Sequence, residues 1–124
     1  MIKLILRIVS LSEGAFGLLL LAYPPIVLQL LFDTDALGME VIFSRLTGAC
    51  LIALAVACWP IGDSRSAFYG MLTWSVLAML YLLRIGIRGI PVGPLLWPAV
   101  VVHTIIIVLL VLAKIRGRKP ASHR

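Results

Sequence analysis

Cysteine, histidine and acidic residues are scarce in this chain, which has two cysteines, two histidines and five Asp or Glu residues in 124. Cys50 and Cys58 would lie about 12 Å apart on a helix, too far for a disulfide bond between them. No CxxC motif occurs, which disfavours dithiol redox chemistry. The sequence also contains no nucleophile–base set, phosphate-binding loop or cluster of metal ligands. We therefore expect no catalytic residue set, no metal and no cofactor.

Charge is also scarce, and apolar residues take its place. Charged residues make up 13% of the chain and hydrophobic residues 62%, with a mean hydropathy of +1.13. A soluble domain of this length buries only a modest core and would expose much of that apolar surface to water. The composition therefore predicts a protein embedded in a lipid bilayer.

Four apolar stretches are long enough to span a membrane, since a helix needs about 20 residues to cross about 30 Å of hydrocarbon. We predict one all-α membrane domain over residues 1–124, with spans at about 2–23, 40–59, 66–84 and 94–114. Tyr23-Pro24-Pro25 should end the first span, and about 25–32 is predicted to be a short interfacial helix. Glu13 interrupts the first apolar stretch, so we expect a retained helix rather than a cleaved signal peptide. The short connections predict an up-down four-helix bundle.

Lysine and arginine are unevenly distributed over the span ends. One side of the membrane would hold Lys3, Arg7, Arg65, Lys114, Arg116, Arg118, Lys119 and Arg124. The other would hold Arg84 and Arg88 with the acidic residues Asp33, Asp35 and Glu40. Because basic loops stay in the cytoplasm, both termini are predicted to be cytoplasmic. The basic C-terminal tail predicts contact with anionic membrane lipids rather than with nucleic acid.

Small residues recur every four positions in the second span, at Ala49, Ala53 and Ala57. Such a ridge allows another helix to approach closely. We expect it to pack against a neighbouring helix of the same chain, with contact between copies in a homo-oligomer as the alternative.

Three polar residues fall inside the predicted spans. Glu13 and His103 lie near mid-membrane, and Arg45 lies about 7 Å below the non-cytoplasmic interface. A charge at the centre of a membrane helix costs about 2.5–3.5 kcal/mol on insertion scales, so the three groups are expected to converge on one interior site. Two interpretations remain open: a proton-responsive or ligand-binding site, or a structural polar contact between helices.

Two arginines flank the glycine- and proline-rich segment after the third span. Arg84 and Arg88 are candidate ligands for a lipid headgroup, because a guanidinium group binds phosphate through two parallel hydrogen bonds. Ordinary extension of both side chains to the membrane surface is the alternative.

Several local features resemble those of a known group of membrane proteins. The first span ends in Leu19-Leu20-Leu21-Ala22-Tyr23-Pro24, and the second contains Arg45-Leu46-Thr47-Gly48-Ala49. The third ends at Arg84 before Gly89-Ile90-Pro91, and the fourth carries His103 near its middle. In these respects the chain resembles the small four-helix bacterial membrane proteins of the DoxX-like group, particularly the DUF4345 type. Their last helix favours an acidic residue where this chain has His103.

The resemblance implies a multi-pass protein of the bacterial inner (cytoplasmic) membrane, associated with quinone or redox enzymes. Our first functional hypothesis is a non-catalytic accessory or scaffold subunit that binds lipid or quinone within a larger membrane complex. The alternative is a small oligomeric proton-coupled transporter that uses Glu13 and His103. A membrane enzyme acting on a lipid-like substrate ranks third, with Glu13–His103 as its only candidate base.

Overall fold

The computed structural model describes residues 1–35, 38–88 and 92–117. Gly89-Ile90-Pro91 of the family resemblance and the tail from Arg118 onward, including His123, lie outside the described residues. All regular structure in the described part is helical, which confirms the all-α class. It consists of α1 (Ile2–Ala22), α2 (Pro24–Phe32), α3 (Met39–Ala57), α4 (Arg65–Ile87) and α5 (Leu96–Arg116). Four of these helices, α1, α3, α4 and α5, are long and apolar enough to cross a membrane.

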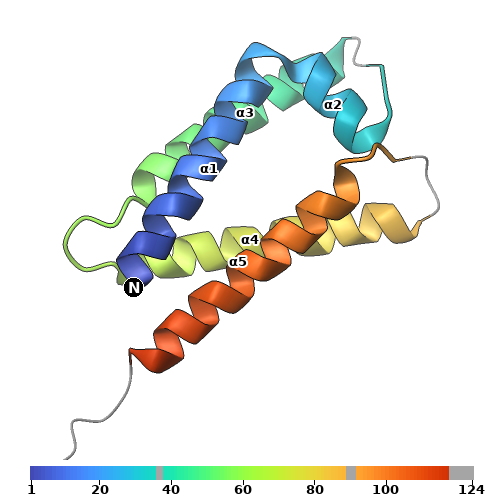
Figure 1. Ribbon diagram of the computed structural model, residues 1–124. Coiled ribbons are helices and arrows are strands. Elements are labelled where there is room, and N and C mark those ends of the chain that lie inside the picture. The colour runs from blue at the N-terminus through green and yellow to red at the C-terminus, as the bar shows by residue number, and fades with distance from the viewer. Residues whose placement is uncertain (36–37, 89–91, 118–124) are drawn as a thin grey trace, which may run out of the picture.

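Helices α1 and α3 form an antiparallel hairpin whose backbones touch (Figure 1). A Cβ atom added to Gly48 would lie 2.5 Å from the carbonyl oxygen of Gly17, and one added to Gly17 would lie 2.7 Å from that of Gly48. Toward the other end of the hairpin, a Cβ on Gly14 would lie 3.2 Å from the Cβ of Ala55. Between membrane helices, such close approach gives the van der Waals contact that holds them together.

The face of α3 that packs against α1 differs from the one expected. Its buried residues are Ser44, Gly48, Leu51 and Ala55, whereas Ala49, Ala53 and Ala57 are exposed. The expectation that the alanine ridge packs within the chain is therefore wrong. Ala49, the first alanine of the ridge, follows the buried Gly48 by one residue. Successive residues are about 100° apart around a helix, so the ridge lies on a different face.

Helices α4 and α5 form a second antiparallel hairpin (Figure 1). A Cβ added to Gly86, near the end of α4, would lie 3.1 Å from side-chain atoms of Leu96 and Trp97 at the start of α5. At the opposite end, the ammonium group of Lys114 lies 4.8 Å from the ring centre of Phe68. These contacts place the beginning of each helix beside the end of the other.

Helix α2 connects the far ends of the two hairpins. Prolines occupy its first turn, where a backbone N–H would have no hydrogen-bond acceptor within the helix in any case. At its C-terminal end, the carbonyl groups of Leu30 and Leu31 accept hydrogen bonds from the N–H groups of Leu95 (2.9 Å) and Gly93 (3.1 Å). These bonds satisfy carbonyls that a helix end leaves without partners. A side chain at Gly93 would collide with the Leu30 carbonyl, so the contact requires glycine.

The two hairpins are inclined to one another and meet through α1, α4 and α5 (Figure 1). One apolar cluster lies where α1 and α4 begin and α5 ends, and includes Leu6, Val9, Phe68, Met71 and Leu110. A second cluster joins α1, α2 and α3, and contains Leu20, Val27, Leu31 and Leu51. Glu13 lies on α1 between the two clusters.

Candidate functional site

Glu13 lies on the buried face of α1, together with Leu6, Ser10, Gly17 and Leu20. This helical spacing of three or four residues continues the face that packs against the other helices. The side chain of Glu13 is 8% exposed, so its carboxyl group faces the protein interior rather than the lipid. This agrees with the rule that ionisable groups in membrane helices face the interior and have a partner.

The partner of Glu13 is His103 on α5. Atom Nε2 of His103 lies 3.7 Å from Oε1 of Glu13, and the histidine side chain is 15% exposed. The other ring nitrogen, Nδ1, lies 2.8 Å from the carbonyl oxygen of Ala99. A carbonyl can only accept a hydrogen bond, so Nδ1 must carry a proton and donate it. This assigns the neutral tautomer of His103 and leaves Nε2 as the basic atom that faces Glu13.

The geometry allows the two side chains to share one proton. With the proton on Glu13, both groups are neutral; with the proton on Nε2, a carboxylate faces an imidazolium. Both arrangements have zero net charge, whereas gain or loss of a proton leaves a net charge among apolar helices. The spacing of 3.7 Å suits an ion pair but exceeds hydrogen-bond length, so movement of the proton between the two atoms requires the two side chains to come slightly closer.

Trp74 is a third member of the site that the sequence did not identify. From α4 it packs against both apolar clusters, between which Glu13 lies, and its buried Nε1 makes no hydrogen bond within the described part of the chain. Its neighbour Ser75 is fully buried, and its hydroxyl group also lacks a partner there. The position of Trp74 along the helix could have indicated this from the sequence. Trp74 lies about 14 Å from the start of α4, which is near mid-membrane, like Glu13.

Arg45 does not belong to this site, contrary to the expected convergence of three groups. Gly14 faces Ala55 and Gly17 faces Leu51. This register places Arg45 level with Tyr23, just after the end of α1 and about 15 Å along the helix axis from Glu13. Arg45 also follows the buried Ser44 and is itself exposed, so it points away from the α1 contact. Across the residues that the structure describes, its guanidinium group forms no ion pair.

Arg84 and Arg88 lie at the C-terminal end of α4, and both are exposed. A cation in this place is favoured by the partial negative charge of the helix C-terminus. The two arginines are far from the Glu13–His103 pair along the membrane axis. Their binding of a lipid headgroup stays a prediction.

Metal binding finds no support in the described segments, which contain no group of three His, Cys, Asp or Glu side chains able to hold an ion. Glu13 and His103 supply two ligands and Trp74 supplies only an N–H donor, which cannot coordinate a metal. The Glu13 carboxyl group and Nε2 of His103 can each accept a proton, so the arrangement suits the binding of a proton. No protein-family model, curated protein or solved structure matches this chain, and the resemblance to DoxX-like proteins stays an expectation from the sequence.

Proposed function

We propose that this protein is a small proton-coupled membrane transporter in which Glu13 and His103 form the proton site. The observation that carries the proposal is the buried 3.7 Å contact between Oε1 of Glu13 and Nε2 of His103. A buried carboxyl and imidazole in membrane helices are costly to retain and commonly serve proton relays. The contact favours this function over the accessory role that ranked first from the sequence.

The position of the pair supports coupling of the proton to a movement. Glu13 belongs to the α1–α3 hairpin and His103 to the α4–α5 hairpin, and each hairpin is held more extensively within itself than to the other. A change in the charge of the pair alters the attraction between the hairpins. Rocking of one helical unit against another is how many transporters alternate access to a site near the midplane.

The proposal includes an arrangement in the membrane. The four spans would form an up-down bundle in a bacterial inner membrane, with both termini on the cytoplasmic side as the basic residues predict. The exposed ridge of Ala49, Ala53 and Ala57 would be the contact between copies in an oligomer, since small residues favour helix association in lipid.

Reversible proton binding by Glu13 tests the proposal directly. Infrared difference spectra of the protein in lipid bilayers, recorded between about pH 5 and 9, should contain a carboxyl band if a buried carboxyl group binds and releases a proton in this range. Glu13→Gln should remove that band. His103→Gln should shift its midpoint, because the two groups share a proton. Glu40→Gln, which removes an exposed carboxyl group on α3, should leave the band unchanged. A Glu13 band that does not change over this range would refute a transport role.

A second candidate function is an accessory subunit that binds lipid or quinone within a larger complex. It is favoured by the exposure of α4, whose apolar stretch is only 11% buried. Leu77 and Leu80 lie on the exposed surface of this helix. A photo-crosslinking residue at either position should yield one discrete adduct with another membrane protein in native membranes, whereas Leu110, which is fully buried, should yield none. Adducts with lipid alone would argue against this role.

A further inference from the structure

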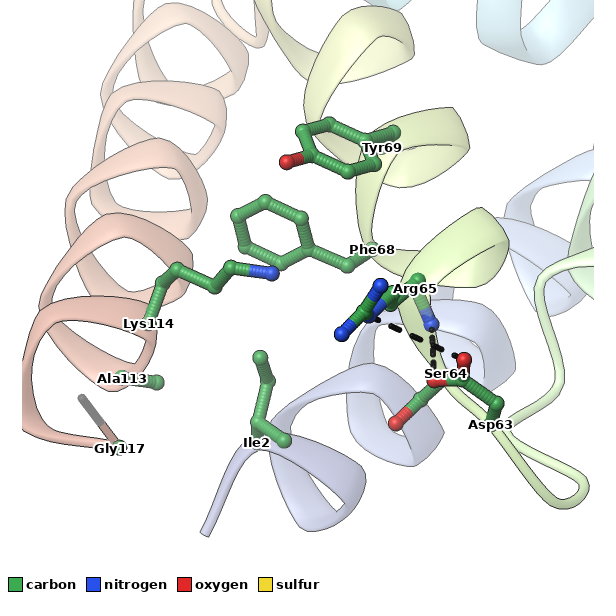
Figure 2. A pocket seen from close by; sticks show the side chains of 9 residues that line it. All are labelled: Ile2, Asp63, Ser64, Arg65, Phe68, Tyr69, Ala113, Lys114 and Gly117. Carbon is green, nitrogen blue, oxygen red and sulfur yellow. Dashed lines mark hydrogen bonds and ion pairs between the residues drawn. The ribbon is translucent and has the colours of Figure 1, made fainter.

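An open cavity of about 510 Å³ lies at the end of the molecule away from α2, outside the Glu13–His103 site. It is formed by three separate parts of the chain: the start of α1, the start of α4 with the preceding loop, and the end of α5. Figure 2 shows the side chains that line it. The cavity lies at helix ends, so in a membrane it would open at the level of the lipid headgroups.

Two cationic side chains point into this cavity from different helices. Lys114 extends from α5 toward Phe68, and Arg65 extends from the first turn of α4 into the same space (Figure 2). The ammonium group of Lys114 lies 4.8 Å from the ring centre of Phe68 and 5.2 Å from that of Tyr69. These cation–π contacts hold the ammonium group in the cavity, and Lys114 forms no ion pair within the described segments.

Among the described residues, one anionic group lines the cavity, and it does not neutralise both cations. Oδ1 of Asp63 accepts a hydrogen bond from the backbone N–H of Arg65 at 3.2 Å. Oδ2 of Asp63 lies 3.9 Å from Nε of Arg65, in a pair whose side chains are 80% and 76% exposed. Such an exposed pair contributes little, and the terminal nitrogens of Arg65 remain free to bind another group. Two cations and one carboxylate give the described lining residues a formal charge of +1.

We propose that this cavity binds the phosphate group of an anionic amphiphile. Arg65 would bind the phosphate oxygens through its planar guanidinium group, and Lys114 would add a point charge from the opposite wall. Ile2, Phe68 and Ala113 supply apolar surface beside the two cations, which suits the glycerol and first methylene groups of a lipid. A singly charged phosphodiester complements the charge of the cavity. The proposal is independent of the proton site.

Native mass spectrometry of the purified protein in a neutral detergent tests this site. The protein would be titrated with short-chain phosphatidylglycerol, with phosphatidylcholine of the same chain length, and with inorganic phosphate. We expect phosphatidylglycerol to bind more tightly than phosphatidylcholine. The double variant Arg65→Gln/Lys114→Gln should bind phosphatidylglycerol about tenfold more weakly, as expected for the loss of charge-assisted hydrogen bonds.

The matched control is Lys3→Gln/Arg116→Gln, which removes one lysine and one arginine at the same end of the molecule. Both residues are exposed and neither lines the cavity, so affinity should change less than about twofold. Equal losses in the two double variants, or no loss in either, would overturn the proposal. Displacement of the lipid by inorganic phosphate would identify the phosphate group itself as the ligand, and failure to displace it would identify the intact lipid.

Folding of each variant would be checked by its helical circular dichroism. If the double variant does not fold, Arg65→Gln alone provides the test, because that side chain is 80% exposed and its loss disturbs no packing. Unchanged phosphatidylglycerol affinity in this single variant would contradict the assignment of Arg65.

Discussion

At the scale of single residues, the protein concentrates its buried ionisable chemistry in two side chains that face one another. In the proposed proton site, Glu13 and His103 are each tolerable among apolar helices because the other can hold or supply the proton that keeps the pair neutral. The Ala99 carbonyl is equally important, since it fixes which nitrogen of His103 faces Glu13. This explains why a single histidine on α5 is sufficient to complete the site.

The energetic coupling of the pair gives a prediction at this scale. His103→Ala should destabilise the protein because it leaves the Glu13 carboxyl group buried without a partner. Adding Glu13→Gln to that variant should recover part of the loss, with a coupling energy of about 0.5–3 kcal/mol, as is usual for groups in contact. Unfolding in bicelles, measured for the parent protein, both single variants and the double variant, provides the four values needed.

Thr104→Val is the control for this cycle, because Thr104 lies next to His103 and its hydroxyl group donates a hydrogen bond to the Val100 carbonyl of the same helix at 2.8 Å. It should show no coupling to Glu13→Gln. Additive effects of the Glu13 and His103 substitutions would mean that the two groups do not interact energetically.

At the scale of helices, close backbone packing holds α1 to α3, whereas α2 is joined to the segment before α5 by hydrogen bonds between main-chain groups. Gly17 and Gly48 are placed so that each would direct a Cβ atom at the other's carbonyl group. Neither position can accommodate a side chain unless the helices separate.

Gly48→Ala is therefore predicted to destabilise the α1–α3 hairpin by about 1–3 kcal/mol, the usual cost of inserting atoms into a packed interface. Alanine favours a helix over glycine by about 1 kcal/mol, so a loss of stability can only come from the contact with α1. The measurement is again the free energy of unfolding in bicelles.

Gly117→Ala is the matched control, because its added Cβ would meet only ordinary contacts at 3.4 Å and beyond. It should leave stability unchanged or slightly raised. Equal stability of Gly48→Ala and the parent protein would show that α1 and α3 are not in close contact.

Depth in the membrane was predictable from the sequence, but the direction of each side chain around its helix was not. Counting residues placed Glu13 and His103 at the same level, and the structure brings them together. Arg45 and the Ala49–Ala53–Ala57 ridge were misplaced because α3 is apolar on nearly every face. Lipid and protein interior are both apolar, so hydrophobic periodicity does not reveal which face of such a helix is buried. Only the contact with Gly17 distinguishes Gly48 from Ala49.

At the scale of the whole molecule, the two ends of the structure differ in charge as well as in shape. The end with the cavity carries Lys3, Arg65, Lys114 and Arg116, whereas Arg84 and Arg88 at the opposite end are accompanied by the acidic residues Asp33 and Glu40. Since cytoplasmic loops are rich in lysine and arginine, this asymmetry sets the orientation expected in a membrane.

Single cysteines introduced into a variant without Cys50 and Cys58 should report this orientation. Cysteine at Asp63 or Arg116 should react with a membrane-impermeant maleimide only from the cytoplasmic side. Cysteine at Glu40 or Arg88 should react only from the outside. Labelling of all four positions from one side would contradict the assignment of four membrane-crossing helices.

The hydrogen bonds between α2 and the segment before α5 have a consequence for how this sequence can vary among related chains. Both use only main-chain groups, so replacement of the side chains at Leu30 and Leu95 would leave the donors and acceptors unchanged. The position that cannot vary is Gly93, where any Cβ atom would collide with the Leu30 carbonyl. In related proteins, we therefore expect one invariant glycine in this short segment, with variable residues at the neighbouring positions.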